Sequence, residues 1–388
     1  MERPLLSIVV PTKNRYEYLL PCLETLISLK TKFPEVEIVV QDNTIDNSIM
    51  LNHPYIKEGL IRYYHVLGNL SQSENCELAI SNSTGEYICM LGDDDSVTSF
   101  IIDVCKWMKE NEIDACLGRI CRYNWADMVY TMHKLKNLII PASLPNRKVG
   151  IQDPVKIREK TLRCGGVSMN ILPRVYHAIV TKKALDKLKR LCGFYFPGPS
   201  PDMANAIGLT FILKKYVVIN TPIIVSGFSY KSAGGAGTRR AHVGKIEDVQ
   251  QLPYKTRYIW DKRIPRYWTA ETIYAESIVE TLNNYNSHCT HKLSFNALYG
   301  SFAMYHLNLI NLLGDFVGIN NIFQVTYHFT KVLLKRTKNY IKNLGEAKFG
   351  ITSNTTFDKV NTLLDAVYKV EKWTKSTKQH LSHREIKL

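Results

Sequence analysis

The sequence predicts an α/β protein with a mostly parallel central sheet covered by helices, followed by a helical region. Three observations lead to this fold class. Short apolar runs alternate with helical periodicity over the first 120 residues, which is typical of βαβ units. Three of these runs end directly in polar residues. Beyond about residue 250 the periodicity is helical only. We therefore divide the chain into a first domain, 1–245, and a mainly helical, basic region, 246–388.

The first domain opens with a strand, a helix and a second strand. Leu5–Val10 is an apolar run interrupted only by Ser7, as expected of a buried strand. Arg15–Leu29 places its leucines on one helical face, and Glu37–Gln41 is the second strand. Because the carboxyl ends of parallel strands share one edge of a sheet, the polar residues after each strand should lie together there.

The same alternation continues along the domain. We expect strands at Ile61–Val66 and Tyr87–Leu91 and helices at Ser73–Ser81 and Phe100–Lys109. The pattern then becomes mixed. The later elements are a strand at Val175–Val180, helices at Lys182–Leu191 and Pro201–Leu213, strands at Tyr216–Ile219 and Ile223–Val225, and a flexible glycine-rich loop at Gly227–Gly244.

The charge of the protein favours an anionic partner. Its 50 Lys and Arg exceed its 35 Asp and Glu, which gives a formal charge of +15. Residues 331–388 hold 13 basic and 5 acidic residues, so 13 − 5 = +8 of this charge lies there. One interpretation is attraction to anionic lipid headgroups or to a lipid-linked pyrophosphate. The other, and the more common origin of such a pattern, is the solvated face of ordinary surface helices.

The cysteines and the apolar runs indicate a cytoplasmic location. Nine cysteines are scattered without a CxxC pair, as expected of reduced thiols. The start of the chain runs into a short strand broken by Pro11 and does not resemble a signal peptide. The most apolar later run, Leu307–Phe323, is interrupted by Asn308, Asn311, Asp315 and Asn320, so we expect no membrane span.

Three adjacent carboxylates follow the strand Tyr87–Leu91, namely Asp93, Asp94 and Asp95. Each close pair costs about 1–4 kcal/mol when both groups are ionised. A divalent cation offsets this repulsion, because Mg²⁺ and Mn²⁺ bind carboxylate and phosphate oxygens. Capping of the next helix by Asp95 or Ser96 is the alternative, but one aspartate would suffice for that. We therefore predict a divalent metal, Mn²⁺ or Mg²⁺, bound together with a phosphate group.

Two common nucleotide-binding motifs are absent from the sequence. No GxGxxG follows the first strand and no Walker A sequence occurs, which argues against a dinucleotide site and a P-loop.

Four segments together resemble the inverting family 2 glycosyltransferases of the GT-A fold. They are "SIVVPTKNR" at 7–15, "VVQDNTIDNS" at 39–48, "SENCELAISNSTGEYICMLGDDDSV" at 73–97 and "SPDMANAIGL" at 200–209. The resemblance extends over about residues 1–230 in order and spacing, and ends before about residue 250. It implies a Rossmann-like GT-A catalytic domain in 1–245 with a nucleotide-sugar donor at the polar edge of the sheet.

The resemblance also implies roles for the residues at that edge. The donor contacts would be Pro11, Thr12 and Asn14 in the nucleotide pocket, Asp42 at the base, Asn75 at the ribose or sugar side, and Asp93 at the metal-bridged diphosphate. Many relatives read Leu-Asp-x-Asp-Asp, whereas Gly92 stands at the first of these aspartates here. Either Asp94 keeps the usual role and Asp93 substitutes, or Asp93 and Asp95 form a shifted pair. All three stay candidate metal ligands.

The expected general base is Asp202. Inversion requires one group that takes the proton of the attacking acceptor hydroxyl, and in the family this is an acidic residue some 100 positions after the metal motif. Asp202 lies 107 residues after Asp95 and opens a helix. The alternative is an ordinary helix start, with Ser200 as cap and Pro201 in the first turn. A helix N-terminus would keep Asp202 ionised while lowering its basicity.

The glycine-rich segment "SYKSAGGAGTRRAH", 229–242, adds three candidates. In related enzymes a mobile loop at this place closes over the diphosphate, so Arg239 and Arg240 would bind the diphosphate and His242 the metal. A surface loop with incidental basic residues is the alternative. Asn170, Arg174 and His177 are secondary candidates for the acceptor cleft, and Gly165-Gly166 is more simply a turn.

These observations predict a metal-dependent, inverting, hexosyltransferase-type enzyme. It would move a sugar from a nucleotide-sugar, with UDP favoured, to a hydroxyl of a saccharide or lipid-linked saccharide acceptor in building a bacterial surface polysaccharide such as capsule or O-antigen. We expect a cytoplasmic protein with peripheral contact to the inner face of an anionic membrane, homo-oligomerisation and no nucleic-acid partner. The alternatives are a nucleotidyltransferase and a non-catalytic module that binds glycans or polyanions.

Overall fold

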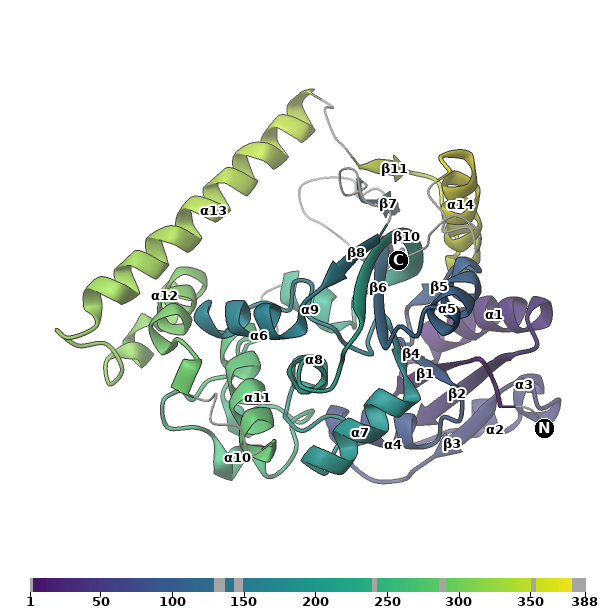
Figure 1. Cartoon of the computed structure of the whole chain (residues 1–388), viewed down its shortest axis with the longest axis horizontal. Helices are drawn as coiled ribbons and strands as arrows, with labels where there is room; N and C mark the ends of the chain where they lie inside the picture. Colours follow the sequence, from purple (N-terminus) through teal and green to yellow (C-terminus); the bar gives the residue numbers. More distant parts are fainter. Residues whose placement is uncertain are drawn as a thin grey trace.

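The centre of the fold is one mixed sheet with the strand order β11-β7-β6-β9-β4-β1-β2-β3, shown in the computed structural model of Figure 1. The structure describes residues 3–128, 137–142, 149–238, 243–285, 291–349 and 354–378. Four neighbouring strands are parallel: β1 (Leu6–Thr12), β2 (Val36–Asp42), β3 (Arg62–His65) and β4 (Tyr87–Met90). They confirm the predicted parallel arrangement of the first four strands.

Helices cover this parallel part on two faces. Ile8 and Val10 belong to the core that also contains Trp107, whereas Val9 packs in a second core with Ile80. Alternate residues of β1 therefore face opposite layers, as the two-residue repeat of a strand requires. The helices of the first layer are α1 (Tyr16–Lys32) and α5 (Phe100–Glu110), and those of the second are α4 (Gln72–Ser81) and α7 (Lys182–Cys192).

Antiparallel strands extend the sheet beyond this parallel part. β9 (Ile179–Thr181) joins β4 to β6 (Ala115–Asn124) by antiparallel pairing on both sides. Of the strand predicted at Val175–Val180, only the last two residues therefore belong to a β-strand. The remaining strands are β5 (Ser96–Val97), β7 (Leu138–Ile140), β8 (Val149–Gln152), β10 (Tyr216–Phe228) and β11 (Thr355–Phe357).

β10 is one long strand where the sequence predicts two. It pairs with β6 in parallel, and the register shifts on either side of Pro222. Proline lacks the N–H of a ladder hydrogen bond, so it interrupts pairing without ending the strand. Part of the predicted flexible loop is helical as well, in α9 (Ala233–Thr238). The further short helices are α2 (Ser48–Leu51) and α3 (Pro54–Lys57), and α6 (Pro154–Arg163) and α8 (Pro201–Leu209) follow later in the chain.

The predicted helical region after residue 245 is confirmed. It contains η1 (Ile246–Asp248), α10 (Thr256–Ile259), α11 (Ala270–Asn284), α12 (Phe295–Tyr305), η3 (Leu307–Leu313), α13 (Ile322–Phe349) and α14 (Leu363–Ser376). α8, α11 and α12 share a core that includes Met203, Ile278 and Phe302. None of the described helices is long and apolar enough to cross a bilayer.

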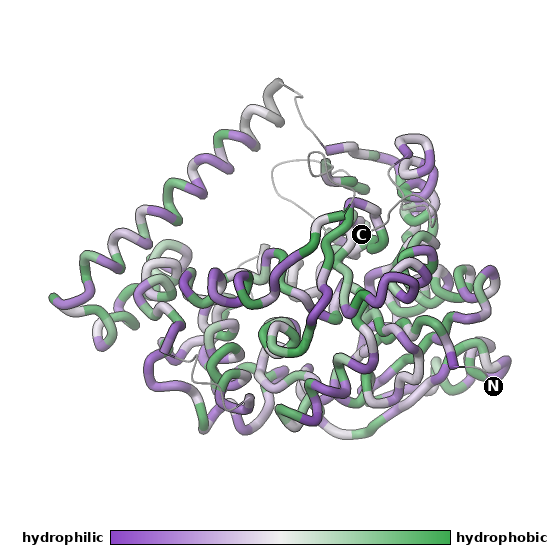
Figure 2. The backbone as a smooth tube through the Cα atoms, in the orientation of Figure 1, coloured by the Kyte–Doolittle hydropathy of each residue, from purple (hydrophilic) through white to green (hydrophobic). Residues whose placement is uncertain are grey.

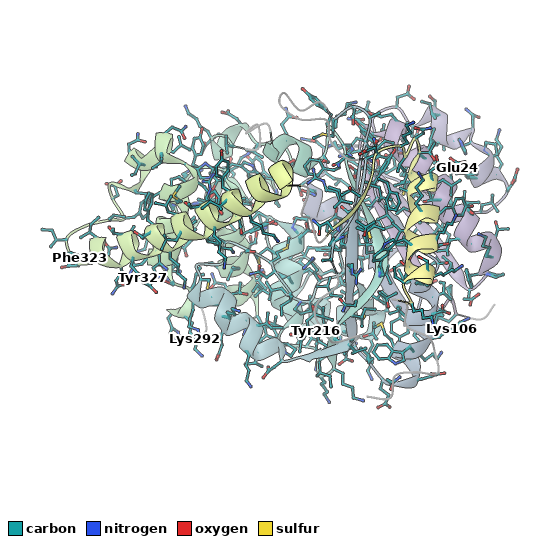
Figure 3. All side chains as sticks on the ribbon, turned by 90° about the horizontal axis from the view of Figure 1, so that it is seen from above. Glu24, Lys106, Tyr216, Lys292, Phe323 and Tyr327 are labelled. Carbon is teal, nitrogen blue, oxygen red and sulfur yellow. The ribbon has the colours of Figure 1, made fainter. Side chains whose placement is uncertain are left out.

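The end of the chain returns to the first core. β11 pairs with β7, and Leu363 and Val370 of α14 pack in the same cluster as Leu19 of α1. Figure 3 accordingly shows α13 and α14 on opposite sides of the molecule. In Figure 2 the central strands are mainly apolar, whereas α13 alternates between polar and apolar residues along its length. The basic C-terminal region is therefore divided between two places.

Candidate active site

The three carboxylates lie together at the carboxyl end of β4. Asp93, Asp94 and Asp95 are 5 %, 4 % and 1 % exposed. The chain leaves β4 through a tight turn in which the N–H of Asp95 donates to the carbonyl of Gly92 (3.2 Å). Close burial of three like charges is costly unless each has partners, and the partners of the three differ.

Asp95 is fully engaged by the protein. Its Oδ1 accepts from the N–H of Gly227 at 2.8 Å. Its Oδ2 lies 2.6 Å from His177 Nε2, 3.1 Å from the Tyr176 hydroxyl and 2.7 Å from the N–H of Gly92. Burial acts to raise the pKa of Asp95, but the attraction of His177 and these hydrogen bonds outweigh it and hold the pKa below its ordinary value. Asp95 therefore joins β4, β10 and the 176–177 segment.

Asp93 and Asp94 share the guanidinium of Arg15. Arg15 Nε lies 3.1 Å from Asp93 Oδ1, and Nη2 lies 3.2 Å from Asp94 Oδ2. Each carboxylate also accepts a hydrogen bond from a hydroxyl group. The Thr12 hydroxyl donates to Asp93 (2.7 Å), and the Ser229 hydroxyl donates to Asp94 (2.5 Å). Burial raises the pKa of both aspartates, Arg15 opposes this, and the repulsion within the triplet adds to it. One cation thus only partly compensates the buried negative charge.

Two glycines make room for this arrangement. A Cβ on Gly92 would lie 2.9 Å from Asp95 Oδ2 and 3.1 Å from Asp94 Oδ1. A side chain at residue 92, where many relatives carry aspartate, would therefore displace these oxygens. At Gly227 a Cβ would lie 1.7 Å from the carbonyl oxygen of Asp94, so only glycine lets the end of β10 approach the triplet this closely.

Thr12 contacts the triplet through Asp93, and Asn75 contacts Thr12. Asn75 is 7 % exposed, and its Nδ2 donates to the carbonyl of Thr12 at 3.1 Å. Its Oδ1 is buried without a hydrogen-bond partner. Buried polar atoms are almost always paired in native proteins, so this oxygen marks a place where a hydroxyl or amide of a ligand can donate.

Asn14 and Asp42 surround the ends of β1 and β2. Asn14 is exposed and has a left-handed backbone, φ 58°, which asparagine tolerates. Asp42 is completely buried, and it accepts hydrogen bonds from Tyr16 (2.6 Å), Tyr63 (2.7 Å) and the N–H of Thr44 (2.7 Å). Its carboxylate organises the end of β2. Pro11, the remaining candidate of this group, is half-buried at the end of β1, and contact of these residues with a nucleotide stays a prediction.

Asp202 is the second residue of α8 and lies close to the triplet. Burial raises the pKa of its carboxyl group, the charges of Arg174 and His177 oppose this, and the charge of Asp95 adds to it. No residue of the described ranges is seen to donate a hydrogen bond to this carboxylate, and the Ser200 side chain does not cap the helix. The structure thus brings Asp202 into the field of the His177–Asp95 pair with its oxygens available.

Asn205 fixes the start of α8 against the rest of the site. Its Oδ1 accepts from the N–H of Val175 (2.9 Å), and its Nδ2 donates to the carbonyl of Tyr195 (3.1 Å). The first of these bonds ties α8 to the segment that carries His177. His177 has a left-handed backbone, φ 59°, and its N–H donates to the carbonyl of Met90 at 3.0 Å. Helix, segment and β4 are therefore held in one arrangement.

The three candidates from the glycine-rich segment, Arg239, Arg240 and His242, lie outside the described residues. The segment begins at the triplet, because Ser229 is completely buried against Asp94. Among the described residues, no group of three or more His, Cys, Asp and Glu side chains is arranged to hold a metal ion.

The sequence analysis did not identify Arg15, Tyr176 and Ser229 as residues of the site. It placed His177 in the acceptor cleft and not beside Asp95. Arg15 stands at the end of the first family segment, one residue after Asn14, and a cation directly after β1 is a signal that could have been used. His177 and Ser229 lie 82 and 135 residues from their aspartates, and no local pattern reveals such pairs.

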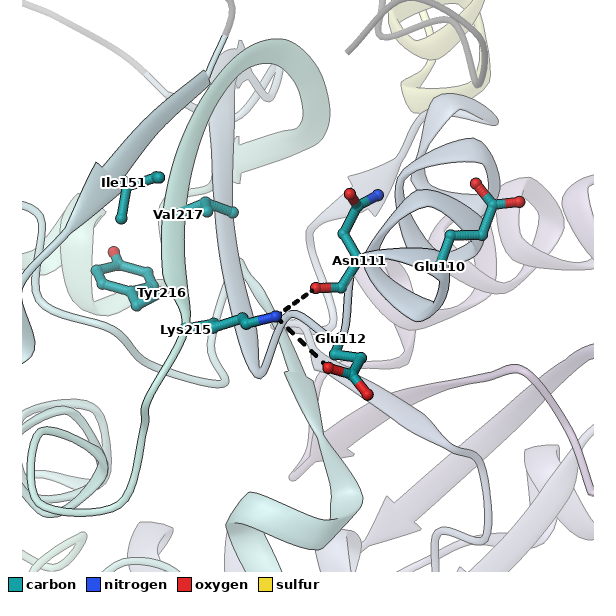
Figure 4. Close-up of a pocket in the computed structure, with 7 residues that line it drawn as sticks. All are labelled: Glu110, Asn111, Glu112, Ile151, Lys215, Tyr216 and Val217. Carbon is teal, nitrogen blue, oxygen red and sulfur yellow. Dashed lines mark hydrogen bonds and ion pairs between the residues drawn. The ribbon is translucent and has the colours of Figure 1, made fainter. Parts of the chain in front are cut away.

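A separate pocket of about 390 Å³ lies at the other end of β10, between Glu110, Ile151 and Lys215 (Figure 4). Tyr216 and Val217 at the start of β10 line it, whereas Gly227 at the end of that strand contacts Asp95. None of the predicted site residues lines this pocket.

Comparison with known proteins finds a family resemblance in the first part of the chain. Residues 7–169 match the profile of the glycosyl transferase family 2. The chain is 30 % identical over 128 residues to the glycosyltransferase GlyG of Streptococcus pneumoniae, covering 32 % of this chain and 41 % of that protein. It is 26 % identical over 136 residues to the poly(ribitol-phosphate) beta-glucosyltransferase of Bacillus spizizenii, covering 34 % and 22 %. The matches span less than half the length of these curated relatives.

Solved structures of S. aureus TarS are also similar. The structure of TarS 1–349 in complex with UDP-GlcNAc gives a TM-score of 0.45 at 13 % identity, covering 83 % of this chain and 79 % of that one. The complex with UDP gives 0.43 at 14 %, covering 96 % and 91 %.

The family match contains the whole edge formed by β1, β2, α4 and the triplet. The segment around Asp202, which the resemblance also includes, follows the matched range. Residues 7–169, which contain this edge, are similar to the glycosyl transferase family 2.

Proposed function

We propose that the protein is a metal-dependent, inverting hexosyltransferase that moves a sugar from a UDP-sugar to a hydroxyl of a saccharide acceptor. One observation carries this proposal: a buried carboxylate pair lies near an aspartate, Asp202, whose carboxylate receives no hydrogen bond from the described residues. The relatives named above are glycosyltransferases, and one acts on poly(ribitol-phosphate). The net charge of +15 suits such a polyanionic acceptor.

The residues at the triplet fit a divalent cation held jointly with a diphosphate. Asp93 and Asp94 are buried with a single guanidinium between them, so their negative charge is undercompensated. Mg²⁺ is usually bound by one or two carboxylates together with phosphate oxygens. We assign Asp93 and Asp94 as the ligands, because the oxygens of Asp95 already have protein donors. When bound, Mn²⁺ or Mg²⁺ offsets the charge of the leaving diphosphate.

Asp202 would act as the general base. The acceptor hydroxyl oxygen attacks the anomeric carbon while the bond from that carbon to the diphosphate breaks, and the hydroxyl proton passes to Asp202. A single displacement of this kind inverts the anomeric configuration. A raised pKa makes Asp202 more basic than a solvated aspartate, and since no described residue donates to its oxygens, they can accept from the acceptor hydroxyl.

The donor would lie along the edge between β1, β2 and α4. Asn75 Oδ1, the unpaired buried oxygen, can accept from a hydroxyl of the ribose or the sugar. Pro11, Thr12 and Asn14 would border the nucleotide, and Asp42 would shape the base pocket. Arg15 would turn from Asp93 to the diphosphate. Arg239 and Arg240 as diphosphate contacts and His242 as a further metal ligand stay proposals from the sequence.

The cellular setting belongs to the same proposal. We place the protein in the cytoplasm, at the periphery of the inner face of the membrane, where it would build a bacterial surface polysaccharide such as capsule or O-antigen on a saccharide or lipid-linked saccharide. Homo-oligomerisation remains part of this proposal.

Incubation with radiolabelled UDP-sugars, manganese and poly(ribitol-phosphate) tests the proposal. We expect transfer of label from one UDP-sugar to the polymer, with release of UDP. A nucleotidyltransferase would instead form a nucleotide-sugar from a sugar phosphate and a nucleoside triphosphate. Formation of that product, without transfer to any saccharide acceptor, would contradict the proposal.

A further inference from the structure

The first turns of helix α13 pack on α12, whereas its later residues up to Lys342 are exposed. Val325 is 6 % exposed, and the backbone at Val325 and Phe329 closely approaches Gly300 of α12, where a Cβ would lie 2.7 Å from the carbonyl oxygen of Val325. From Leu333 to Lys342 every residue is exposed. Figure 1 shows this second half extending away from the helices around α12. Over these three turns the apolar side chains are exposed, so they need a reason other than packing in the core of the protein.

One line of this helix is apolar and exposed. Phe323, Tyr327, Leu334 and Ile341, here called the apolar stripe, are 84 %, 63 %, 65 % and 63 % exposed. Their spacings of four and seven residues place them on one face of the helix. In Figure 3 Phe323 and Tyr327 point outward at the end of the molecule.

Basic residues border the apolar stripe. Residues 322–342 contain five basic residues and no acidic residue. Lys331 and Lys338 each follow a stripe residue, Tyr327 or Leu334, by four positions, so they lie beside the stripe. Lys335 and Lys342 continue this row and are exposed as well. The fifth, Arg336, donates to the carbonyl of Met304 at 3.3 Å.

The other aromatic residues of the basic C-terminal region are not part of this surface. On α14, the Tyr368 ring lies 5.5 Å from Lys32 Nζ, and the Trp373 ring lies 5.7 Å from the guanidinium carbon of Arg119. Both therefore face the first domain. Of the candidate lipid-binding residues in the sequence after 330, those of α13 alone combine exposed apolar side chains with a bordering row of lysines within the described residues.

We propose that the apolar stripe and its bordering lysines form the surface by which this protein docks on a bilayer of anionic lipids. α13 would lie in the plane of the headgroups, with the stripe in the acyl boundary and the lysines at the phosphates. The charge selects this occupant, because the five basic residues of 322–342 complement anionic headgroups, whereas a second copy would bring an equally basic helix against this one. The inference deepens the peripheral location proposed above and is independent of the transfer chemistry.

Flotation of the full chain with lipid vesicles tests this proposal, in the absence of any donor or acceptor. We expect the protein to float with vesicles of phosphatidylcholine and phosphatidylglycerol and not with phosphatidylcholine alone. Leu334→Ser and Ile341→Ser should each lower the partition coefficient about tenfold or more. Lys331→Gln and Lys338→Gln should each lower it about fivefold, and added salt should weaken the binding.

Matched controls come from exposed residues elsewhere. Ile151→Ser and Lys156→Gln replace side chains of comparable exposure on β8 and α6, and we expect them to bind vesicles like the wild type. Absence of flotation, or equal loss in the control variants, would overturn the proposal. So would a self-associating protein that Leu334→Ser makes monomeric while vesicle binding stays unchanged. The flotation test contains no substrate. Its result can therefore be interpreted even if the protein lacks the proposed transferase activity.

Discussion

His177 Nε2 lies 2.6 Å from Asp95 Oδ2, across 82 residues of sequence, and both side chains are buried. This contact connects the metal-motif turn to the segment that α8 holds through Asn205. Because His177 contacts this oxygen, Asp95 is less available to bind a ligand than Asp93 and Asp94. The charges of His177 and Asp95 also act on the pKa of Asp202 in opposite directions. The two halves of the proposed chemistry are therefore structurally coupled.

The first prediction concerns this contact. His177→Ala should lower the free energy of unfolding by about 2–4 kcal/mol, because it leaves a buried carboxylate without a charge-assisted partner and opens a cavity. Urea unfolding of His177→Ala, Asp95→Asn and the double variant measures the coupling. We expect the double variant to lose less than the sum of the single losses. Strict additivity would show that the two side chains do not interact.

The second prediction concerns Arg15. Arg15→Met should lower the free energy of unfolding by about 2–4 kcal/mol at neutral pH, since the buried carboxylates of Asp93 and Asp94 lose the cation that they share. Manganese alone should restore more stability to this variant than to the wild type, because the metal no longer competes with the guanidinium. Arg15→Lys serves as the charge-conserving control and should respond less to manganese than Arg15→Met. An equal manganese response in all three proteins would contradict the assignment of Asp93 and Asp94 as ligands.

The third prediction separates binding from chemistry. Asp202→Asn should reduce transfer by about 10²–10⁴-fold, the usual contribution of a general base, while the dissociation constant of the donor changes little. Asp94→Asn should weaken donor binding itself. Titration calorimetry with the donor and a transfer assay on the same preparations distinguish the two. A tight-binding Asp202→Asn variant that retains wild-type transfer would exclude Asp202 as the base.

The fourth prediction is a pH dependence of stability in the helical region. Burial raises the pKa of Glu276 on α11 to about 8, the N–H of Asp261 opposes this, and the charges of Asp261 and Glu280 add to it. Between the ordinary value of 4.5 and about 8 the folded protein binds a proton that the unfolded chain has released. Stability should therefore fall as pH rises through this window, by on the order of 4 kcal/mol from this group.

Glu276→Gln isolates that contribution. The variant cannot ionise at this position. Its free energy of unfolding should therefore decline less between pH 5 and pH 8 than that of the wild type, because the contribution from the raised pKa of Glu276 is missing. Denaturant unfolding at several pH values measures the difference. If the free energy of unfolding depends on pH in the same way in wild type and variant, Glu276 has the same pKa in the folded and the unfolded protein, which would contradict the prediction.

The parallel part of the fold could be predicted because its strands and helices carry local periodic patterns. β6 could not, since Arg119 and Arg122 interrupt its apolar residues. Arg119 is nevertheless 9 % exposed, and the guanidinium of Arg122 packs 3.8 Å from the Phe228 ring centre. Tertiary packing buries Arg119 and covers part of Arg122, and no pattern within the strand predicts this packing.

The same limit applies to the site. Thr12, Asn75 and the triplet follow or face parallel strand ends, so topology predicts that they meet. The partners that decide which aspartate is free, His177 and Ser229, come from distant segments. The return of α14 to the first core likewise depends on long-range contacts, as between Ser28 and Tyr368.

The central claim is that the edge formed by β1, β2, α4 and the triplet binds a nucleotide-sugar with a metal. A thermal-shift panel of UDP-, GDP- and dTDP-sugars, with and without manganese, tests it most directly. We predict metal-dependent stabilisation by UDP-sugars, about 2.7 kcal/mol at a hundred times the dissociation constant, and its loss in Asp94→Asn. Well-folded protein that responds to none of these nucleotides, with or without manganese, would contradict the claim.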